Sequence, residues 1–251
     1  MSTKISLITV TYQSASTLQT TIDSVRRQNC SDIEYIVVDG GSTDGTIEIL
    51  KNNHDVVNQW ISEPDKGVYD AMNKGVELAT GDVLGFLHAD DMFASSEVLN
   101  MVRQRYNESS FHILYGDLEY VSPEDIEKVV RYWRSGSFRQ RHLQRGWMPP
   151  HPTVYVDRRF FREIGRYNLD FRISADYEWL LRALSTPSVR VEYLAEVMVR
   201  MRLGGLSNGS LKNVIVKSTE DLRALRENAI GGVTTLLLKN ATKVTQFVRR
   251  N

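Results

Sequence analysis

Two adjacent carboxylates, Asp90 and Asp91, directly follow an apolar run at residues 83–87 that has the length of a buried strand. Neighbouring carboxylates repel each other, and removing them from water costs free energy. A divalent cation offsets both penalties, because Mn²⁺ and Mg²⁺ bind carboxylate oxygens and bridge to substrate phosphates. A plainer interpretation is that the pair opens a helix, since acidic residues stabilise helix N-termini. The pair is therefore a candidate Mn²⁺ or Mg²⁺ site with one structural alternative.

Polar residues also follow two other predicted strands. The strand at residues 5–11 ends at Thr11 and Tyr12, and the strand at residues 35–38 ends at Asp39. Ligands of open α/β sheets bind beyond the carboxyl ends of the strands, so we expect these residues in the same crevice as the carboxylate pair. The chain has no G-x-G-x-x-G after the first strand and no G-x-x-x-x-G-K-[ST], which argues against a dinucleotide fingerprint and a P-loop.

The elements that position these residues alternate over the first 90 residues. Apolar runs predict strands at residues 5–11, 35–38, 57–61 and 83–87. Helical spacing of apolar residues predicts helices at residues 16–28, 44–50 and 69–79. This alternation predicts an α/β fold with a mostly parallel central sheet flanked by helices.

The second half of the chain is less regular. We expect strands at residues 113–120, 127–133, 189–194 and 197–201, and helices at residues 176–184, 213–228 and 233–250. The polar, arginine-rich residues 135–150 predict a mobile loop. We expect one core domain over residues 1–205 and a C-terminal helical tail over residues 206–251.

Composition excludes several classes of protein. The 251 residues are 41% apolar and carry no formal net charge, so nothing global points to nucleic acid. The single cysteine, Cys30, rules out an internal disulfide and favours a reducing compartment. The start of the chain lacks the pattern of a signal peptide, and no run approaches 18 consecutive apolar residues. We therefore expect a cytoplasmic protein.

Five segments resemble the family 2 glycosyltransferases in order and spacing: ISLITVTYQSASTLQTTIDSVRRQ, EYIVVDGGSTDGT, SEPDKGVYDAMNKG, ATGDVLGFLHADD and RISADYEWLLR. The resemblance covers roughly residues 4–205. It implies a GT-A fold, a nucleotide-sugar donor, Mn²⁺ or Mg²⁺, and inversion at the anomeric carbon. The segments resemble the subgroup of bacterial enzymes that build polysaccharide repeat units, such as colanic acid and O-antigen. Processive relatives carry Q-x-x-R-W and membrane spans, which this chain lacks, so we expect one sugar added per encounter.

The resemblance implies roles for residues at the donor site. Thr11 and Tyr12 match the strand end beneath the nucleotide base. Asp39 matches the acid that accepts from a base N–H, and an acceptor-only carboxylate suits the uracil of a UDP-sugar. Asp65 and Lys66 match the loop near the ribose and the sugar.

The resemblance also implies roles in the chemistry. Asp90 matches the main metal ligand, with Asp91 supporting it, and Asp176 matches the general base. The alternative for Asp176 is an N-cap of the helix that it opens. His88 departs from the usual Asp or Asn, and imidazole can ligate Mn²⁺ or hydrogen-bond a ribose hydroxyl. His151 is either an acceptor contact or an exposed loop residue.

Basic residues cluster in two stretches of the sequence that contain no Asp or Glu. Residues 128–145 contain Lys128, Arg131, Arg134, Arg139, Arg141 and Arg145, and residues 231–251 contain Lys239, Lys243, Arg249 and Arg250. In the second stretch one helical face carries Val233, Leu237, Ala241, Val244 and Val248, with Leu236 and Phe247 beside it. A basic amphipathic helix indicates a membrane-surface element, and the alternative is a helix packed on the core.

The resemblance implies an acceptor for these basic residues. Repeat-unit enzymes use an undecaprenyl-diphosphate-linked saccharide at the cytoplasmic face of the membrane. Arg139 and Arg141 would pair with its diphosphate, to which the planar guanidinium is suited. We therefore expect a peripheral membrane enzyme.

Two other functions stay open. A sugar nucleotidyltransferase would carry a glycine-rich, arginine-containing loop after the first strand, where this chain has Thr-Tyr-Gln-Ser-Ala at residues 11–15. A catalytically weak carbohydrate-binding relative is kept open by His88.

Overall fold

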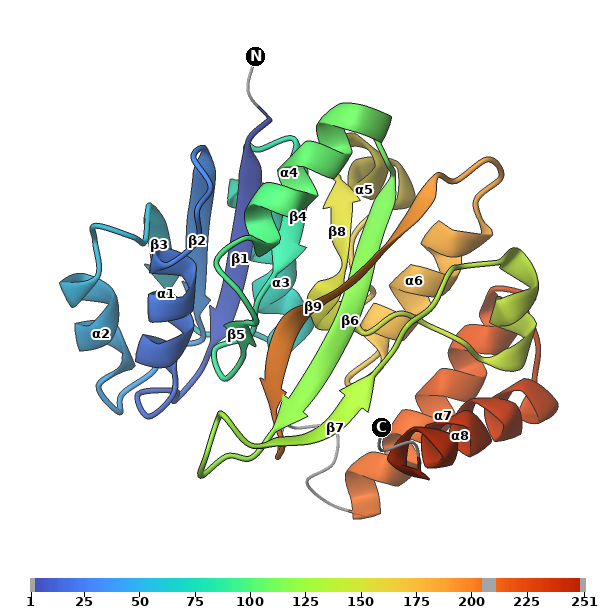
Figure 1. Ribbon diagram of the computed structural model, residues 1–251. Coiled ribbons are helices and arrows are strands. Elements are labelled where there is room, and N and C mark those ends of the chain that lie inside the picture. Colours follow the sequence, from blue (N-terminus) through green and yellow to red (C-terminus); the bar gives the residue numbers. More distant parts are fainter. Residues whose placement is uncertain (1–2, 205–210, 249–251) are drawn as a thin grey trace.

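The computed structural model describes residues 3–204 and 211–248, of which Leu211 and residues 242–248 are described by their backbone alone. In the described part a nine-stranded sheet has the order β3-β2-β1-β4-β8-β6-β9-β5, with β7 paired to β6. Eight α-helices surround it in this part (Figure 1).

The parallel half of the sheet comes from the first 90 residues. Its strands are β3 (Gln59–Ser62), β2 (Ile33–Asp39), β1 (Ile5–Thr11) and β4 (Val83–Phe86), all mutually parallel. The helices between them are α1 (Leu18–Arg26), α2 (Thr46–Asn52) and α3 (Val68–Leu78). This half confirms the predicted alternation of strand and helix.

The second half of the sheet is mixed. The strand β8 (Tyr155–Asp157) is antiparallel to both β4 and β6 (Ile113–Val121), and β9 (Val191–Arg202) is parallel to β6. The strands β5 (Met92–Phe93) and β7 (Val129–Trp133) add antiparallel pairs. The remaining helices are α4 (Val98–Ser109), α5 (Arg158–Ile164), α6 (Ala175–Ser185), α7 (Leu211–Glu227) and α8 (Val233–Val248).

Four local expectations need correction here. The two strands expected at 189–194 and 197–201 form the single strand β9, which shifts register against β6 instead of breaking. The sequence analysis also missed α4 and α5. The loop expected to be mobile contains a 3₁₀ helix, Gln140–Arg145, which buries Leu143 in the core.

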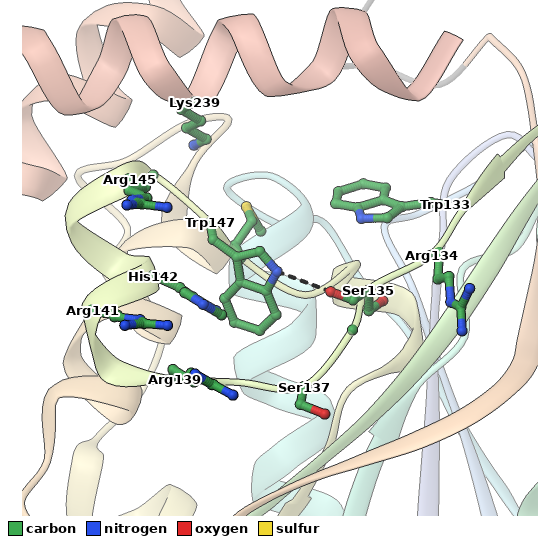
Figure 2. Close-up of a pocket in the computed structure, with 13 residues that line it drawn as sticks. Trp133, Arg134, Ser135, Ser137, Arg139, Arg141, His142, Arg145, Trp147 and Lys239 are labelled. Atoms are coloured by element: carbon green, nitrogen blue, oxygen red, sulfur yellow. Dashed lines mark hydrogen bonds between the residues drawn. The ribbon is translucent and has the colours of Figure 1, made fainter. Parts of the chain in front are cut away.

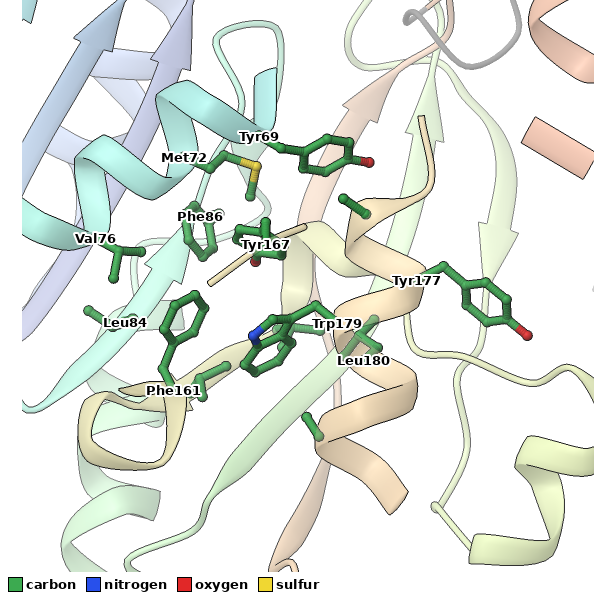
Figure 3. Close-up of a cluster of buried hydrophobic side chains, with 14 of the residues drawn as sticks. Tyr69, Met72, Val76, Leu84, Phe86, Phe161, Tyr167, Tyr177, Trp179 and Leu180 are labelled. Carbon is green, nitrogen blue, oxygen red and sulfur yellow. The ribbon is translucent and has the colours of Figure 1, made fainter. Parts of the chain in front are cut away.

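Two hydrophobic cores lie on the two faces of the sheet, because side chains alternate along each strand. Ile8 of β1 faces a core that includes residues of α3, α5 and α6, and Leu7 faces a core that includes residues of α1 and α4. Figure 3 shows part of the first core, where Trp179 of α6 stacks on Phe161 of α5 with ring centroids 4.9 Å apart.

The helices α7 and α8 form a hairpin against the rest of the chain (Figure 1). Ala224 and Leu225 of α7 are completely buried in the same core as α6. Within the described residues, no helix is both long and apolar enough to cross a bilayer.

Candidate active site

The carboxyl ends of β1, β2 and β4 meet at one edge of the sheet, as predicted. Thr11 lies opposite Asp39 in the register of β1 and β2. The Thr11 hydroxyl is buried and has no hydrogen-bond partner among the described residues, whereas Tyr12 is 62% exposed. This edge therefore offers an unused polar atom beneath an exposed aromatic ring.

The carboxylate of Asp39 accepts hydrogen bonds from the turn that follows it. Its Oδ2 accepts from the amides of Gly41 and Ser42, at 2.9 and 2.8 Å, and from the Ser62 hydroxyl at 2.6 Å. Its Oδ1 accepts from the Ser42 hydroxyl. Each carboxylate oxygen has about two acceptor positions, so Oδ2 is fully used and Oδ1 keeps one position open. The role of Asp39 in recognising a base stays a prediction.

Asp65 lies directly over Gly40. A Cβ at Gly40 would stand 2.5 Å from Oδ2 of Asp65 and 3.3 Å from the Tyr12 ring. The other carboxylate oxygen, Oδ1, accepts from the amide of Gly67 at 2.8 Å. The glycine therefore lets a carboxylate from the neighbouring loop lie beside the exposed Tyr12 ring.

Lys66 is exposed and lines a cavity of about 540 Å³. The cavity is bordered by the loop after β3 and by the segment before α6, with Arg172 and Asn213 in its wall. Tyr69, which also lines it, contacts Asp176, so this cavity adjoins the surroundings of that carboxylate.

Asp90 and Asp91 occupy different environments. Asp90 is half-buried, and its backbone oxygen accepts from Nε of Arg202 at 3.0 Å. Asp91 is completely buried, and neither of its carboxylate oxygens has a hydrogen-bond partner among the described residues. Burial, followed by the charge of Asp90, raises the pKa of Asp91 well above its usual range, although Arg202 opposes this. The pair is followed by β5, so the interpretation that it opens a helix is wrong.

The described residues contain no cluster of three or more His, Cys, Asp or Glu side chains arranged to hold a metal ion. Mg²⁺ sites in phosphate-transferring enzymes commonly use only one or two carboxylates and complete their shell with substrate phosphates and water. The buried Asp91 oxygens beside Asp90 are consistent with such a site.

Asp176 is the second residue of α6, and Oδ1 of its carboxylate accepts from the Tyr69 hydroxyl at 2.9 Å. The N-cap of α6 is Ser174, so the interpretation of Asp176 as the N-cap is wrong. The Asp176 charge acts to raise the pKa of both His88 and His151, whose rings lie 5.9 Å apart. The structure thus brings together groups from the end of β4, from the 3₁₀ turn His151–Thr153 and from α6.

His151 is buried, so the alternative of an exposed loop residue is wrong, and the alternative of an acceptor contact stays a prediction. Its Nε2 lies 3.1 Å from the Tyr167 hydroxyl, and its ring centroid is 5.9 Å from that of His88. Burial lowers the pKa of His151 to about 4, against the charge of Asp176. Burial also lowers the pKa of His88, against the charges of Asp90 and Asp176.

A second cavity of about 540 Å³ is strongly basic (Figure 2). It lies between the end of β7, the 3₁₀ helix Gln140–Arg145 and α8, and its walls include Trp133, Arg134, Arg139, Arg141, Arg145, Trp147 and Lys239. Burial, followed by Arg141, Arg139 and Arg145, lowers the pKa of His142, because a second positive charge there is unfavourable. We call this cavity the basic pocket.

The helix α8 closes tightly over the basic pocket. Gly146 has φ +73°, and a Cβ there would stand 2.4 Å from the Cβ of Lys239. The Nζ of Lys239 forms a buried ion pair at 2.8 Å with Oδ2 of Asp221 and lies 3.1 Å from the centre of the Tyr177 ring. The sequence placed Lys239 among the basic residues of the tail helix, and the structure buries its side chain because that side of α8 packs inward.

The mixed sheet, with helices on both faces and a carboxylate-lined edge, has the GT-A fold. The chain belongs to the family described as Glycosyl transferase family 2, which matches residues 6–165. A PGL/p-HBAD biosynthesis glycosyltransferase of Mycobacterium bovis is 35% identical over 208 residues, covering 81% of this chain and 78% of the relative. An uncharacterized glycosyltransferase of Mycobacterium tuberculosis is 36% identical over 181 residues, covering 71% of this chain and 68% of the relative. Family membership sets aside the sugar nucleotidyltransferase alternative.

Solved structures share the fold at low sequence identity. S. aureus TarS 1–349 in complex with UDP has a TM-score of 0.68 and 17% identity, with 98% of this chain and 71% of that chain covered. The mannosyltransferase PcManGT from Pyrobaculum calidifontis, in complex with GDP-Man and Mn²⁺, has a TM-score of 0.68 and 14% identity, with 100% and 77% covered. Both neighbours bind nucleotides or nucleotide sugars on this fold.

Two residues of this site escaped the sequence analysis. Tyr69 gives no signal except its place within SEPDKGVYDAMNKG, and Arg202 lies at the end of a strand far along the chain. Their contacts with Asp176 and Asp90 depend on tertiary packing alone.

Proposed function

We propose that this glycosyltransferase is an inverting, metal-dependent and non-processive enzyme. It moves one sugar from a nucleotide sugar, a UDP-sugar, to a lipid-diphosphate-linked saccharide in bacterial surface polysaccharide synthesis. The observation that carries the proposal is the position of Asp176, which is held by Tyr69 beside His88 at the edge that also presents Asp90. A base and a carboxylate that can hold the cation for the diphosphate are the two groups that this reaction needs close together.

The donor lies across the ends of β1 and β2 in this proposal. Tyr12 offers an exposed ring for the base, and Asp65 offers a carboxylate oxygen beside that ring. Lys66 and His88 are the proposed contacts of the diphosphate and the sugar, because an ammonium and a neutral imidazole can hydrogen-bond phosphate and hydroxyl oxygens. The relatives in complex with UDP and with GDP-Man support a nucleotide-sugar donor.

Asp176 is the proposed general base. Inversion requires the acceptor hydroxyl to attack opposite the leaving phosphate, and a sugar hydroxyl is a weak nucleophile until its proton is removed. A positioned base contributes about 10²–10⁴-fold, so Asp176→Asn should lower kcat by that factor and leave donor affinity unchanged. The measurement is UDP or GDP release from a panel of UDP- and GDP-sugars. Glu178→Gln is the matched control, because Glu178 is already paired with Arg182; normal turnover in Asp176→Asn would rule out this base.

Asp90, with Asp91 behind it and His88 beside it, would hold Mn²⁺ or Mg²⁺. Asp91 fits this role because its buried oxygens have no other hydrogen-bond partner in the described part of the chain. When bound, the cation stabilises the negative charge that accumulates on the departing diphosphate. Asp90→Ala should abolish transfer in a protein that stays folded, and EDTA should do the same reversibly. Full activity in EDTA, with no metal found by elemental analysis, contradicts the proposal.

The basic pocket is the proposed site of the acceptor diphosphate. Its guanidinium groups can pair bidentately with phosphate oxygens, and its two indole rings offer flat apolar surface. Arg139→Ala with Arg141→Ala should weaken the use of diphosphate-linked acceptors at unchanged donor KM. The control is Arg27→Ala with Arg162→Ala, which removes the same charge from exposed positions elsewhere. Equal loss on acceptors with and without a diphosphate excludes this role.

A further inference from the structure

Three successive backbone amides before α6 donate to a single carboxylate, that of Glu220 in α7. The amide of Arg172 donates to Oε1 at 2.9 Å, and the amides of Ile173 and Ser174 donate to Oε2 at 2.8 and 2.9 Å. The first amides of a helix and of the turn before it have no partner within the helix. A carboxylate from a distant helix therefore fixes the turn that leads into the helix carrying Asp176.

The helix α6 does not supply this cap itself. Its N-cap residue, Ser174, makes no side-chain hydrogen bond of the capping kind, although serine is a preferred N-cap residue. Hydrogen bonds from amides to a charged carboxylate are stronger than those to a neutral hydroxyl, and negative charge at a helix N-terminus is favourable. A Ser174 side-chain cap would accept from amides inside the first turn of α6, whereas Glu220 accepts from the amides of residues 172–174, so Glu220 fixes the turn before the helix.

The same segment is fixed from the opposite side by α3. The Tyr69 hydroxyl lies 2.7 Å from the backbone oxygen of Ile173 and 2.9 Å from Oδ1 of Asp176. The segment is thus held between Glu220 and Tyr69, and its geometry determines where the Asp176 carboxylate points.

The helix α7 is itself anchored beside Glu220. Asp221 is buried and pairs with Lys239 of α8 at 2.8 Å and with Lys217 at 3.5 Å. Burial acts to raise the pKa of Asp221, but Lys239 and Lys217 outweigh it and lower the pKa below its ordinary value. Ala224, one turn further along α7, is completely buried. Glu220 therefore extends from a rigid support.

We propose that Glu220 is a positioning residue for the transfer reaction, since it fixes the segment at residues 172–174 and thereby aims Asp176 at the acceptor hydroxyl. This rests on the proposed role of Asp176 as general base. In this proposal Glu220 itself does not contact the substrate and acts only through Asp176.

The test compares Glu220→Ala and Glu220→Gln with Glu227→Gln, a change on the same helix where the carboxylate is half exposed and pairs with Arg223. Hydrogen exchange of the peptide over residues 168–180 reports on the segment without any substrate. We expect faster exchange in both Glu220 variants, most in Glu220→Ala, and no change in Glu227→Gln. Glu220→Gln keeps the volume of the side chain and one acceptor oxygen. If the alanine variant does not fold, the comparison is made with the glutamine variant.

Kinetics then separate positioning from general stability. A displacement of a reacting group by about 1 Å can lower the rate about 10²-fold, so Glu220→Ala should lower kcat by that order while Kd for UDP stays unchanged. The substrate is the nucleotide sugar that the unmodified protein hydrolyses fastest among UDP- and GDP-sugars. In an Asp176→Asn background, Glu220→Ala should cause no further loss, because the effect passes through the base.

Three results overturn the inference: a kcat within twofold of the unmodified protein in Glu220→Ala, unchanged exchange over residues 168–180, or the same fold loss in the Asp176→Asn background. If Asp176 is not the general base, the results differ from these three. In that case Asp176→Asn alone keeps full turnover, and the exchange measurement still decides whether Glu220 holds the segment.

Discussion

At the scale of single residues, the carboxylate of Asp39 stabilises its own turn without any ligand. It is completely buried and accepts hydrogen bonds from two amides and two hydroxyls. Removing it takes away four hydrogen bonds to a charged group, and each such bond contributes about 1.5–3 kcal/mol.

We therefore expect Asp39→Ala to lower the free energy of unfolding by about 3 kcal/mol or more, and Asp39→Asn by less, because the amide keeps one acceptor. Urea denaturation measures both changes. The control is Asp65→Asn, since Asp65 accepts only one backbone hydrogen bond in the described structure and is half exposed. Equal destabilisation by Asp39→Asn and Asp65→Asn would contradict this account of the turn.

At the scale of elements, Glu34 ties together the amino ends of β1, β2 and β4. Its carboxylate accepts from Lys4 Nζ at 2.8 Å, from the Ser6 hydroxyl, and from the amide and hydroxyl of Thr80 at 2.7 and 2.6 Å. Burial alone would raise the pKa of Glu34, but these bonds outweigh it and lower the pKa from 4.5 to about 2.

A carboxylate whose pKa is lower in the folded state than in the unfolded state stabilises the fold above the unfolded value. For Glu34 this contribution should be complete above pH 4.5 and should disappear as the pH falls toward 2. The difference in unfolding free energy between the unmodified protein and Glu34→Gln should therefore shrink between pH 6 and pH 3. Glu48→Gln, at an exposed position of α2, is the control and should show a constant difference. A Glu34→Gln difference that is independent of pH would refute the linkage.

At the scale of the whole molecule, α8 has an inner and an outer side. Thr235 and Lys239 are buried, whereas Val233, Leu237 and Leu238 are 53%, 63% and 44% exposed. The alternative of packing on the core is therefore correct for this part of the helix. The side chains of Lys243, Val244, Phe247 and Val248, and residues Arg249 and Arg250, lie outside the described ones. Association of the tail with the inner face of the membrane stays a prediction.

The outer side of α8 gives that prediction a sharper test than removal of the helix, which would also open the basic pocket. We expect binding to phosphatidylglycerol vesicles that weakens with salt, and a clear loss of flotation in Leu237→Asp, because a charge on the exposed apolar side of α8 opposes its insertion into the bilayer. The control is Leu169→Asp, at a position 47% exposed elsewhere on the surface. Equal flotation of the two variants would rule out α8 as the anchor.

The sequence alone determined the parallel half of the sheet and the edge where the site lies. The periodicity of residues 5–90 is local, because every strand and helix there is long enough to show its own apolar pattern. The convergence of Thr11, Asp39 and Asp90 at one edge then follows from parallel strands alone.

Tertiary structure decided the rest. The strands β5 and β8 have two and three residues, too few to show a period, so the mixed half of the sheet was not predictable from pattern. The burial of Lys239 depends on which side of α8 meets Asp221, and the cap on α6 depends on Glu220 from the end of the chain. A local pattern shows which side of a single segment is apolar and becomes buried. These contacts join segments that are far apart in the sequence, and neither segment's own sequence indicates its partner.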